Sequence, residues 1–142
     1  MDEEPVIERL VGNRAIETAA VLWVMELERA VGRAPLDRRF EAAFSADIES
    51  PPRLIEVKAV GGNQRGWFVP LEVPQVEEAR RNPNFYLYVV DNVAQGNPAE
   101  FRLKVFGGEQ LARLLVRAKE RRYFEMPIPV AEFDSAPGRD AI

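Results

Sequence analysis

The segment that most constrains the fold is residues 84–91, which read Asn-Phe-Tyr-Leu-Tyr-Val-Val-Asp. Aromatic and β-branched residues favour a strand, and both alternating faces of this segment are apolar or aromatic. A strand that is apolar on both faces has to be covered on both sides, as in the central strands of layered α/β proteins. The chain is therefore expected to build a sheet that carries helices on each face.

The remaining residues supply elements for such a sheet. Apolar residues at helical spacing predict a helix from Asn13 to about Val31, which Gly32 and Pro35 would end. Further strands are expected at residues 46–49, 53–60, 67–71 and 101–106, and further helices at residues 74–81 and 109–122. This order predicts an α/β fold, a three-layer sandwich around a central mixed β-sheet. It would form a single domain over residues 13–142, after a flexible acidic lead-in at residues 1–12.

Two absences narrow the chemistry. The 142 residues include no histidine and no cysteine, so histidine-containing catalytic triads and zinc sites built on imidazole or thiolate are excluded. Acids, bases and ligands must come from carboxylates, lysine, tyrosine or the backbone, a set that favours Mg²⁺ or Mn²⁺ over softer metals. The chain starts without a signal-like segment, and its longest apolar run, Thr18 to Met25, is too short to span a bilayer. A cytoplasmic protein with no membrane partner is expected.

The candidate site lies on two consecutive predicted strands. Side chains alternate along a strand, so Glu56 and Lys58 point to the same face. A hairpin can bring Asp47 beside Glu56, and the two carboxylates with the Val57 carbonyl could then hold a divalent cation. Lys58 would orient or deprotonate an attacking water, or stabilise charge on a phosphate. The competing interpretation is an ordinary ion pair between Glu56 and Lys58 on an exposed sheet face.

A basic run at residues 102–122 contrasts with the formal net charge of −4. It contains seven cations against Glu109 and Glu120, and we expect Lys104, Arg113 and Arg117 to bind nucleic acid. The alternative is the solvated face of a helix. Trp67 is interpreted as sheet packing and not as a base-stacking platform.

Several segments together resemble one family. They are Met25–Pro35, Asp47-Ile48-Glu49-Ser50, Leu54-Ile55-Glu56-Val57-Lys58 and Tyr86–Asn92. They look like the domain of unknown function at the C-terminus of the plant protein NO VEIN, which also occurs beside helicases and in bacterial defence proteins. That domain belongs to the PD-(D/E)XK superfamily, as do the Mrr-type restriction nucleases. The resemblance covers roughly residues 13–115.

The resemblance implies a restriction-endonuclease-like fold and a role for each site residue. Asp47 and Glu56 would be metal ligands for Mg²⁺ or Mn²⁺, and Lys58 would be the catalytic lysine. Glu28 would be the superfamily's helical acid, touching the metal through water; its alternative is a surface glutamate on an amphipathic helix. The family's Asn-Glu-Trp at the second predicted helix appears here as Pro74-Gln75-Val76.

Three functions stay open at this point. The first is a metal-dependent, endonuclease-like hydrolase acting on nucleic acid, with DNA as the expected substrate, in a defence or repair system. The second is a catalytically degenerate module of the same fold that binds nucleic acid or protein, and the third is a purely structural interaction domain. A homodimer, or association with a helicase or another defence-system subunit, is the expected assembly.

Overall fold

The computed structural model describes residues 6–142, so residues 1–5 of the predicted lead-in lie outside the described residues. Five strands form one sheet in the order β1-β2-β3-β4-β5. Strands β3 and β4 are parallel, and the other neighbouring pairs are antiparallel. The predicted α/β class with a mixed sheet is confirmed. The strands are β1 Leu36–Asp37, β2 Ile48–Ser50, β3 Arg53–Ala59, β4 Phe85–Asp91 and β5 Arg102–Phe106.

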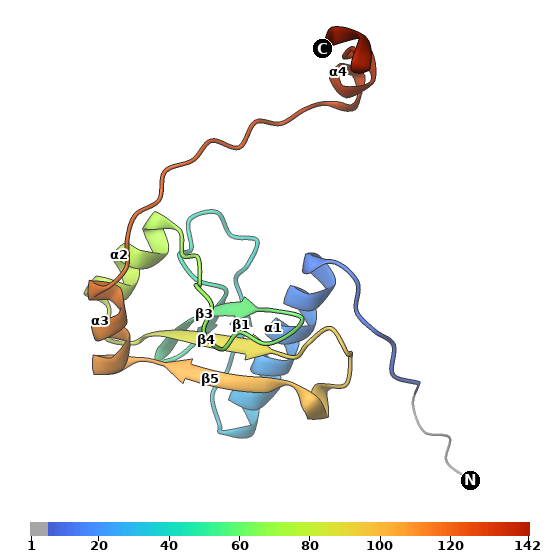
Figure 1. Cartoon of the computed structure of the whole chain (residues 1–142). Coiled ribbons are helices and arrows are strands. Elements are labelled where there is room, and N and C mark those ends of the chain that lie inside the picture. Colours follow the sequence, from blue (N-terminus) through green and yellow to red (C-terminus); the bar gives the residue numbers. More distant parts are fainter. Residues whose placement is uncertain (1–5) are drawn as a thin grey trace.

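Helices cover the two faces of this sheet (Figure 1). Helix α1, Asn13–Ala30, packs on one face through Val21 and Val24, against Ile55, Val57 and Tyr88. We call this side the α1 face. Helices α2, Val73–Arg81, and α3, Gly108–Val116, pack on the other side, the α2/α3 face, where the core includes Phe85, Leu87, Val89, Leu111 and Leu115. Strand β4 contributes to both cores, as its two apolar faces predicted.

The predicted strand at residues 67–71 is wrong. This segment is irregular chain between β3 and α2, and Pro70 in its middle lacks the backbone N–H that a strand ladder needs. Val69 and Leu71 pack into the core of the α2/α3 face. Trp67 and Phe68 point to solvent, with 75% and 94% of their surface exposed. The expectation that Trp67 packs in the sheet is therefore also wrong.

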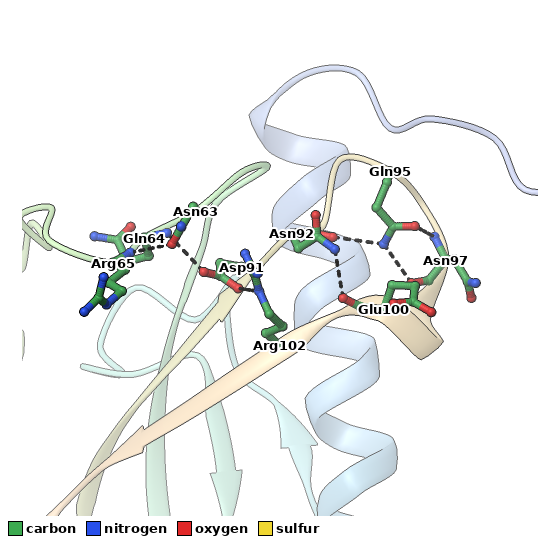
Figure 2. Close-up of polar contacts among 9 residues, drawn as sticks. All are labelled: Asn63, Gln64, Arg65, Asp91, Asn92, Gln95, Asn97, Glu100 and Arg102. Carbon is green, nitrogen blue, oxygen red and sulfur yellow. Dashed lines mark hydrogen bonds and ion pairs between the residues drawn. The ribbon is translucent and has the colours of Figure 1, made fainter.

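The chain that leaves β3 is fastened to the end of β4 (Figure 2). One carboxylate oxygen of Asp91 accepts a hydrogen bond of 3.0 Å from the backbone N–H of Gln64, and the other accepts one of 2.7 Å from Nε of Arg102. The backbone N–H of Asn92, which has a φ of +57°, donates to the Gly62 carbonyl at 2.7 Å. These contacts hold the loop at residues 61–66 against the sheet.

The chain after α3 leaves the body of the protein (Figure 1). Helix α3 ends at Val116, not near residue 122, because the charged run Arg117–Arg122 has only the small Ala118 as an apolar residue to pack against the sheet. All residues from Val116 to Ile142 are exposed. They include the short helices α4, Val130–Ser135, and η2, Arg139–Ala141. Outside the tail, one more short helix, η1, covers Pro98–Glu100 and precedes β5. Within residues 6–142, no helix has the length and apolarity needed to cross a membrane.

Candidate functional site

Asp47 and Glu56 lie side by side where β2 and β3 begin to separate. The ladder pairs Ile48 with Ile55, so the next step along the chain brings Asp47 opposite Glu56. The Asp47 backbone N–H donates to the Ile55 carbonyl at 3.0 Å. Its carboxylate Oδ2 accepts a hydrogen bond of 2.8 Å from the backbone N–H of Val57. This bond fixes the Asp47 carboxylate between the two strands.

Glu56 is the most constrained side chain of the group, with 2% of its surface exposed. Its Oε2 lies 3.1 Å from Nζ of Lys58 and accepts a hydrogen bond of 3.0 Å from Nε2 of Gln75 on α2. Its Oε1 is buried and has no hydrogen-bond partner among the described residues. Sequence reasoning did not assign Gln75 to the site, although its departure from the family pattern drew attention to that position.

The surroundings of Glu56 disfavour its charge. Burial raises the pKa of Glu56 to about 8, with a further rise from the neighbouring Asp47 carboxylate. Lys58 opposes these effects but does not cancel them. These effects favour the protonated form of the Glu56 carboxyl. A carboxyl with so raised a pKa is found more often at functional sites than in ordinary surface ion pairs.

The oxygen atoms of this site suit a hard cation. The unpartnered Oε1 of Glu56 and the Asp47 carboxylate supply two ligand groups. In a strand, the N–H and C=O of one residue point the same way, so the Val57 carbonyl points toward Asp47, as its N–H does. Over residues 6–142, no three acidic, histidine or cysteine side chains gather to hold a metal ion. Two carboxylates and one carbonyl fit Mg²⁺ or Mn²⁺ that keeps several of its waters.

Glu28 is not part of this group, and the expectation that it lies near Asp47 and Glu56 is wrong. Both its carboxylate oxygens accept hydrogen bonds of 2.7 Å from Arg33, and Oε2 also accepts one of 3.2 Å from the Tyr88 hydroxyl. Tyr88 belongs to the core of the α1 face, whereas Glu56 points to the α2/α3 face. The sheet itself separates the two glutamates, because α1 covers the face opposite to the site.

The predicted nucleic-acid contacts fall in two places. Lys104 on β5 pairs with Val89, which pairs in turn with Lys58, so both lysines lie in one row across the α2/α3 face. Lys104 is exposed at the edge of the sheet. Arg113 is exposed on α3, and Arg117 directly follows this helix. Within the described part of the chain, no hydrogen bond or ion pair joins either arginine to Asp47, Glu56 or Lys58.

The fold and the site define an α/β protein with two carboxylates and a lysine on one face of a mixed sheet. A family model described as "Protein NO VEIN, C-terminal" matches residues 16–104, which is more than half of the chain. The chain therefore belongs to this family. The matched range includes Glu28, Asp47, Glu56, Lys58 and Gln75, and it ends before α3. Searches of curated proteins and of solved structures gave no match.

Proposed function

We propose that this protein is a metal-dependent nuclease of the PD-(D/E)XK superfamily, with a restriction-endonuclease-like fold, that hydrolyses phosphodiester bonds of DNA. One observation carries the proposal. Glu56 is buried with an unpartnered oxygen beside a second carboxylate and a lysine. An unmade hydrogen bond of this kind is costly in a folded protein and calls for an explanation. A divalent cation would supply the missing partner.

In this proposal each group has a distinct task. Asp47, Glu56 and the Val57 carbonyl would hold Mg²⁺ or Mn²⁺, which neutralises phosphate charge and lowers the pKa of bound water. On binding the cation, Glu56 would release its proton to solvent, because the cation stabilises the carboxylate anion. Lys58, whose side chain is 26% exposed, reaches from the buried carboxyl toward solvent. From there it would orient the attacking water or stabilise charge on the phosphate.

A degenerate, non-cleaving module is the second candidate, and Gln75 favours it. The resemblance leads one to expect a glutamate at this position, and the amide of Gln75 instead donates to Oε2 of Glu56. A neutral amide at this position adds no third charged ligand, so the site would hold a divalent cation less tightly. Such a module would bind nucleic acid or a protein partner through the same face. In either case we propose assembly as a homodimer, or with a helicase or another defence-system subunit.

A cleavage assay tests the first proposal. Wild-type protein should cut single-stranded or duplex DNA, or RNA, in the presence of Mg²⁺ or Mn²⁺ and not in EDTA. Lys58→Ala should reduce the rate by about 10²–10⁴-fold, the usual range for general acid–base or electrostatic groups. Lys119→Ala, in the exposed tail, is the matched control and should leave the rate unchanged. Absence of cleavage with every substrate and metal would overturn the nuclease and leave the binding module.

Metal binding gives a readout that does not depend on activity. A thermal-shift titration with Mn²⁺ should stabilise the wild-type protein, because a cation that binds only the native state raises its melting temperature. Glu56→Gln should abolish the shift. The control Glu77→Gln changes an exposed carboxylate on α2 and should preserve it. Equal shifts in wild type and Glu56→Gln would refute the assignment of Glu56 as a ligand.

A further inference from the structure

We propose that Trp67 and Phe68 form a stacking platform for the unpaired bases of a single-stranded nucleic acid, with Arg65 and Lys104 placed to contact its phosphates. The inference rests on the proposed function and names the form of substrate that this site accepts. It begins from exposure. Trp67 and Phe68 are adjacent and 75% and 94% exposed, although aromatic side chains of this size are usually largely buried.

The turn that carries the two aromatic residues is held in place. The Trp67 backbone N–H donates to the Gln64 carbonyl at 3.0 Å, which closes a turn through Gly66 at a φ of +84°. The Gln64 side chain donates to the Phe68 carbonyl at 3.2 Å, and the Gln64 backbone N–H is bound to Asp91 (Figure 2). Because the turn is already held, a ligand that stacks on these rings loses less free energy in ordering the loop, which favours affinity.

The chain that follows the platform packs on the face that carries the candidate site. Directly after the aromatic pair, Val69 and Leu71 pack into the core of the α2/α3 face. The same stretch of chain leads into α2, where Gln75 contacts Glu56. The segment from Trp67 to Gln75 therefore connects the exposed rings to the buried carboxyl along one face of the sheet. A strand stacked on the rings would approach Lys58 from solvent.

One cation lies in the turn of the platform, and a second lies in the row of Lys58. Lys104 is two strands from Lys58 in the same row, which places their backbones about 10 Å apart at the usual strand spacing. Arg65 is exposed within the turn itself. Neither Lys104 nor Arg65 forms an ion pair within residues 6–142, whereas Arg102 is paired with Asp91 (Figure 2). Arg65 precedes the two aromatic residues in the turn, and Lys104 shares a row with Lys58. Exposed aromatic rings combined with cations are what proteins use to hold single strands.

The form of the ligand follows from the geometry of stacking. Inside a duplex, base faces are covered by neighbouring base pairs and cannot reach Trp67 or Phe68. An unpaired strand offers both base faces and backbone phosphates, and stacking tolerates any sequence because every base has a π face. Single-stranded DNA and single-stranded RNA share this chemistry, so the experiment includes both.

Trp67 supplies its own reporter. In a Trp23→Phe background Trp67 is the sole tryptophan, and Trp23 itself is a partly buried residue packed edge-on against Phe101. In EDTA, an oligothymidylate or oligouridylate of about 16 nucleotides should quench its fluorescence. An abasic sugar–phosphate strand of equal length and a mixed-sequence duplex should bind more weakly. Equal binding of the abasic strand, or preference for the duplex, would overturn the inference.

Variants then separate stacking from charge. Trp67→Ala, read by fluorescence anisotropy of a labelled oligonucleotide, should lower affinity about 5- to 100-fold, whereas Trp67→Phe should retain most of it. Lys104→Gln should reduce the slope of log affinity against log salt by about 0.7. Phe124→Ala, which removes a fully exposed ring in the tail, is the matched control and should bind as wild type. Wild-type affinity in Trp67→Ala would refute the platform and point to a protein partner for these rings.

These experiments can refute the nuclease proposal and the stacking platform separately. Binding is measured without divalent metal, so it does not require an active centre. Binding by the platform without any metal-dependent cleavage would refute the nuclease and keep the inference. Cleavage by wild type that Trp67→Ala leaves unchanged, together with unchanged affinity, would refute the inference and keep the nuclease.

Discussion

Glu28 on the α1 face and Glu56 on the α2/α3 face are both almost fully buried, with 3% and 2% of their surfaces exposed. Their surroundings differ. Glu28 receives two hydrogen bonds from Arg33 and one from Tyr88, so both of its oxygens are satisfied. Glu56 shares one oxygen between Lys58 and Gln75, and its other oxygen has no partner among the described residues.

The pKa values of the two side chains shift in opposite directions. Burial alone would raise the pKa of Glu28, but the hydrogen bonds and charge of Arg33, with help from Ser50 and Tyr88, outweigh it and lower that pKa. Burial and the Asp47 carboxylate raise the pKa of Glu56 to about 8. The small exposed fractions of the two side chains therefore do not explain why their pKa values shift in opposite directions. The completeness of the hydrogen bonding separates the two: Glu28 has partners for both oxygens, whereas Glu56 leaves one oxygen without a partner among the described residues.

The strongest test of this contrast removes the satisfied carboxylate. Glu28→Gln should lower the free energy of unfolding by about 3 kcal/mol, because it leaves the partly buried Arg33 guanidinium without its anion. Urea denaturation at neutral pH measures the change. Glu26→Gln, on the exposed side of the same helix, should change stability by less than about 0.5 kcal/mol. A loss for Glu28→Gln as small as for Glu26→Gln would break the comparison.

The second test uses pH. Glu56 binds its proton more tightly in the folded than in the unfolded chain, so wild-type stability should fall as pH rises from about 4.5 through the folded pKa near 8. Glu56→Gln lacks this titration and should gain on the order of 2 kcal/mol over wild type between pH 5 and pH 7. Urea denaturation at both pH values measures it, with Glu77→Gln as the control. Parallel profiles for Glu56→Gln and wild type would contradict the raised pKa.

Glu28 should show the reverse dependence. Its folded pKa is lowered, so its contribution to stability is complete above the unfolded pKa of about 4.5 and is lost as pH falls through the folded value. The stability gap between wild type and Glu28→Gln should therefore narrow in acid, below about pH 4.5. A gap that widens in acid would show that Glu28 does not gain from Arg33.

The third test completes the unsatisfied site. Gln75→Glu places a third carboxylate next to Glu56, and the number of charged oxygen ligands tunes the affinity for divalent cations. We expect Mn²⁺ to bind at least about 10-fold more tightly, measured by calorimetry. Gln110→Glu, at an exposed position on α3, is the control and should bind as wild type. Unchanged affinity in Gln75→Glu would count against Asp47 and Glu56 as the proposed metal ligands.

The smallest expected effect concerns the hydroxyl of Tyr88. It donates to Glu28 and accepts from Arg53 at 2.8 Å. Tyr88→Phe removes both bonds and should lower stability by about 1 kcal/mol without changing metal binding. Urea denaturation and the Mn²⁺ thermal shift test the two halves of this statement. An altered Mn²⁺ shift would show that the two faces of the sheet are coupled.

The sequence predicted the parts of this protein whose patterns are local. The helix of α1, the strands β3 and β4 and the neighbouring positions of Asp47, Glu56 and Lys58 follow from periodicity and alternation, which short stretches contain. Glu28 was misplaced because its role came from the family resemblance, and neither that resemblance nor the helical pattern of α1 gives the sheet face on which this helix packs. The partners of both glutamates, Arg33 and Gln75, depend on packing between distant segments.

Other errors arose where local residue preferences did not decide the structure. Trp67 and Phe68 read as a strand, since aromatic residues favour strands, yet the chain exposes both. The two-residue strand β1 is too short to leave a pattern. Helix α3 was predicted six residues too long because Arg117–Arg122 contains good helix formers, and propensity decides little where no face can be buried.

The exposed tail has a hydrodynamic consequence. A compact chain of 142 residues has a radius of gyration of about 14 Å by the usual scaling. With residues 117–142 extended from the body (Figure 1), the scattering profile should give a larger radius and a long tail in the pair-distance distribution. The melting temperature should be insensitive to substitutions there, since no buried contact is lost. Shape and stability are therefore set by different parts of the chain.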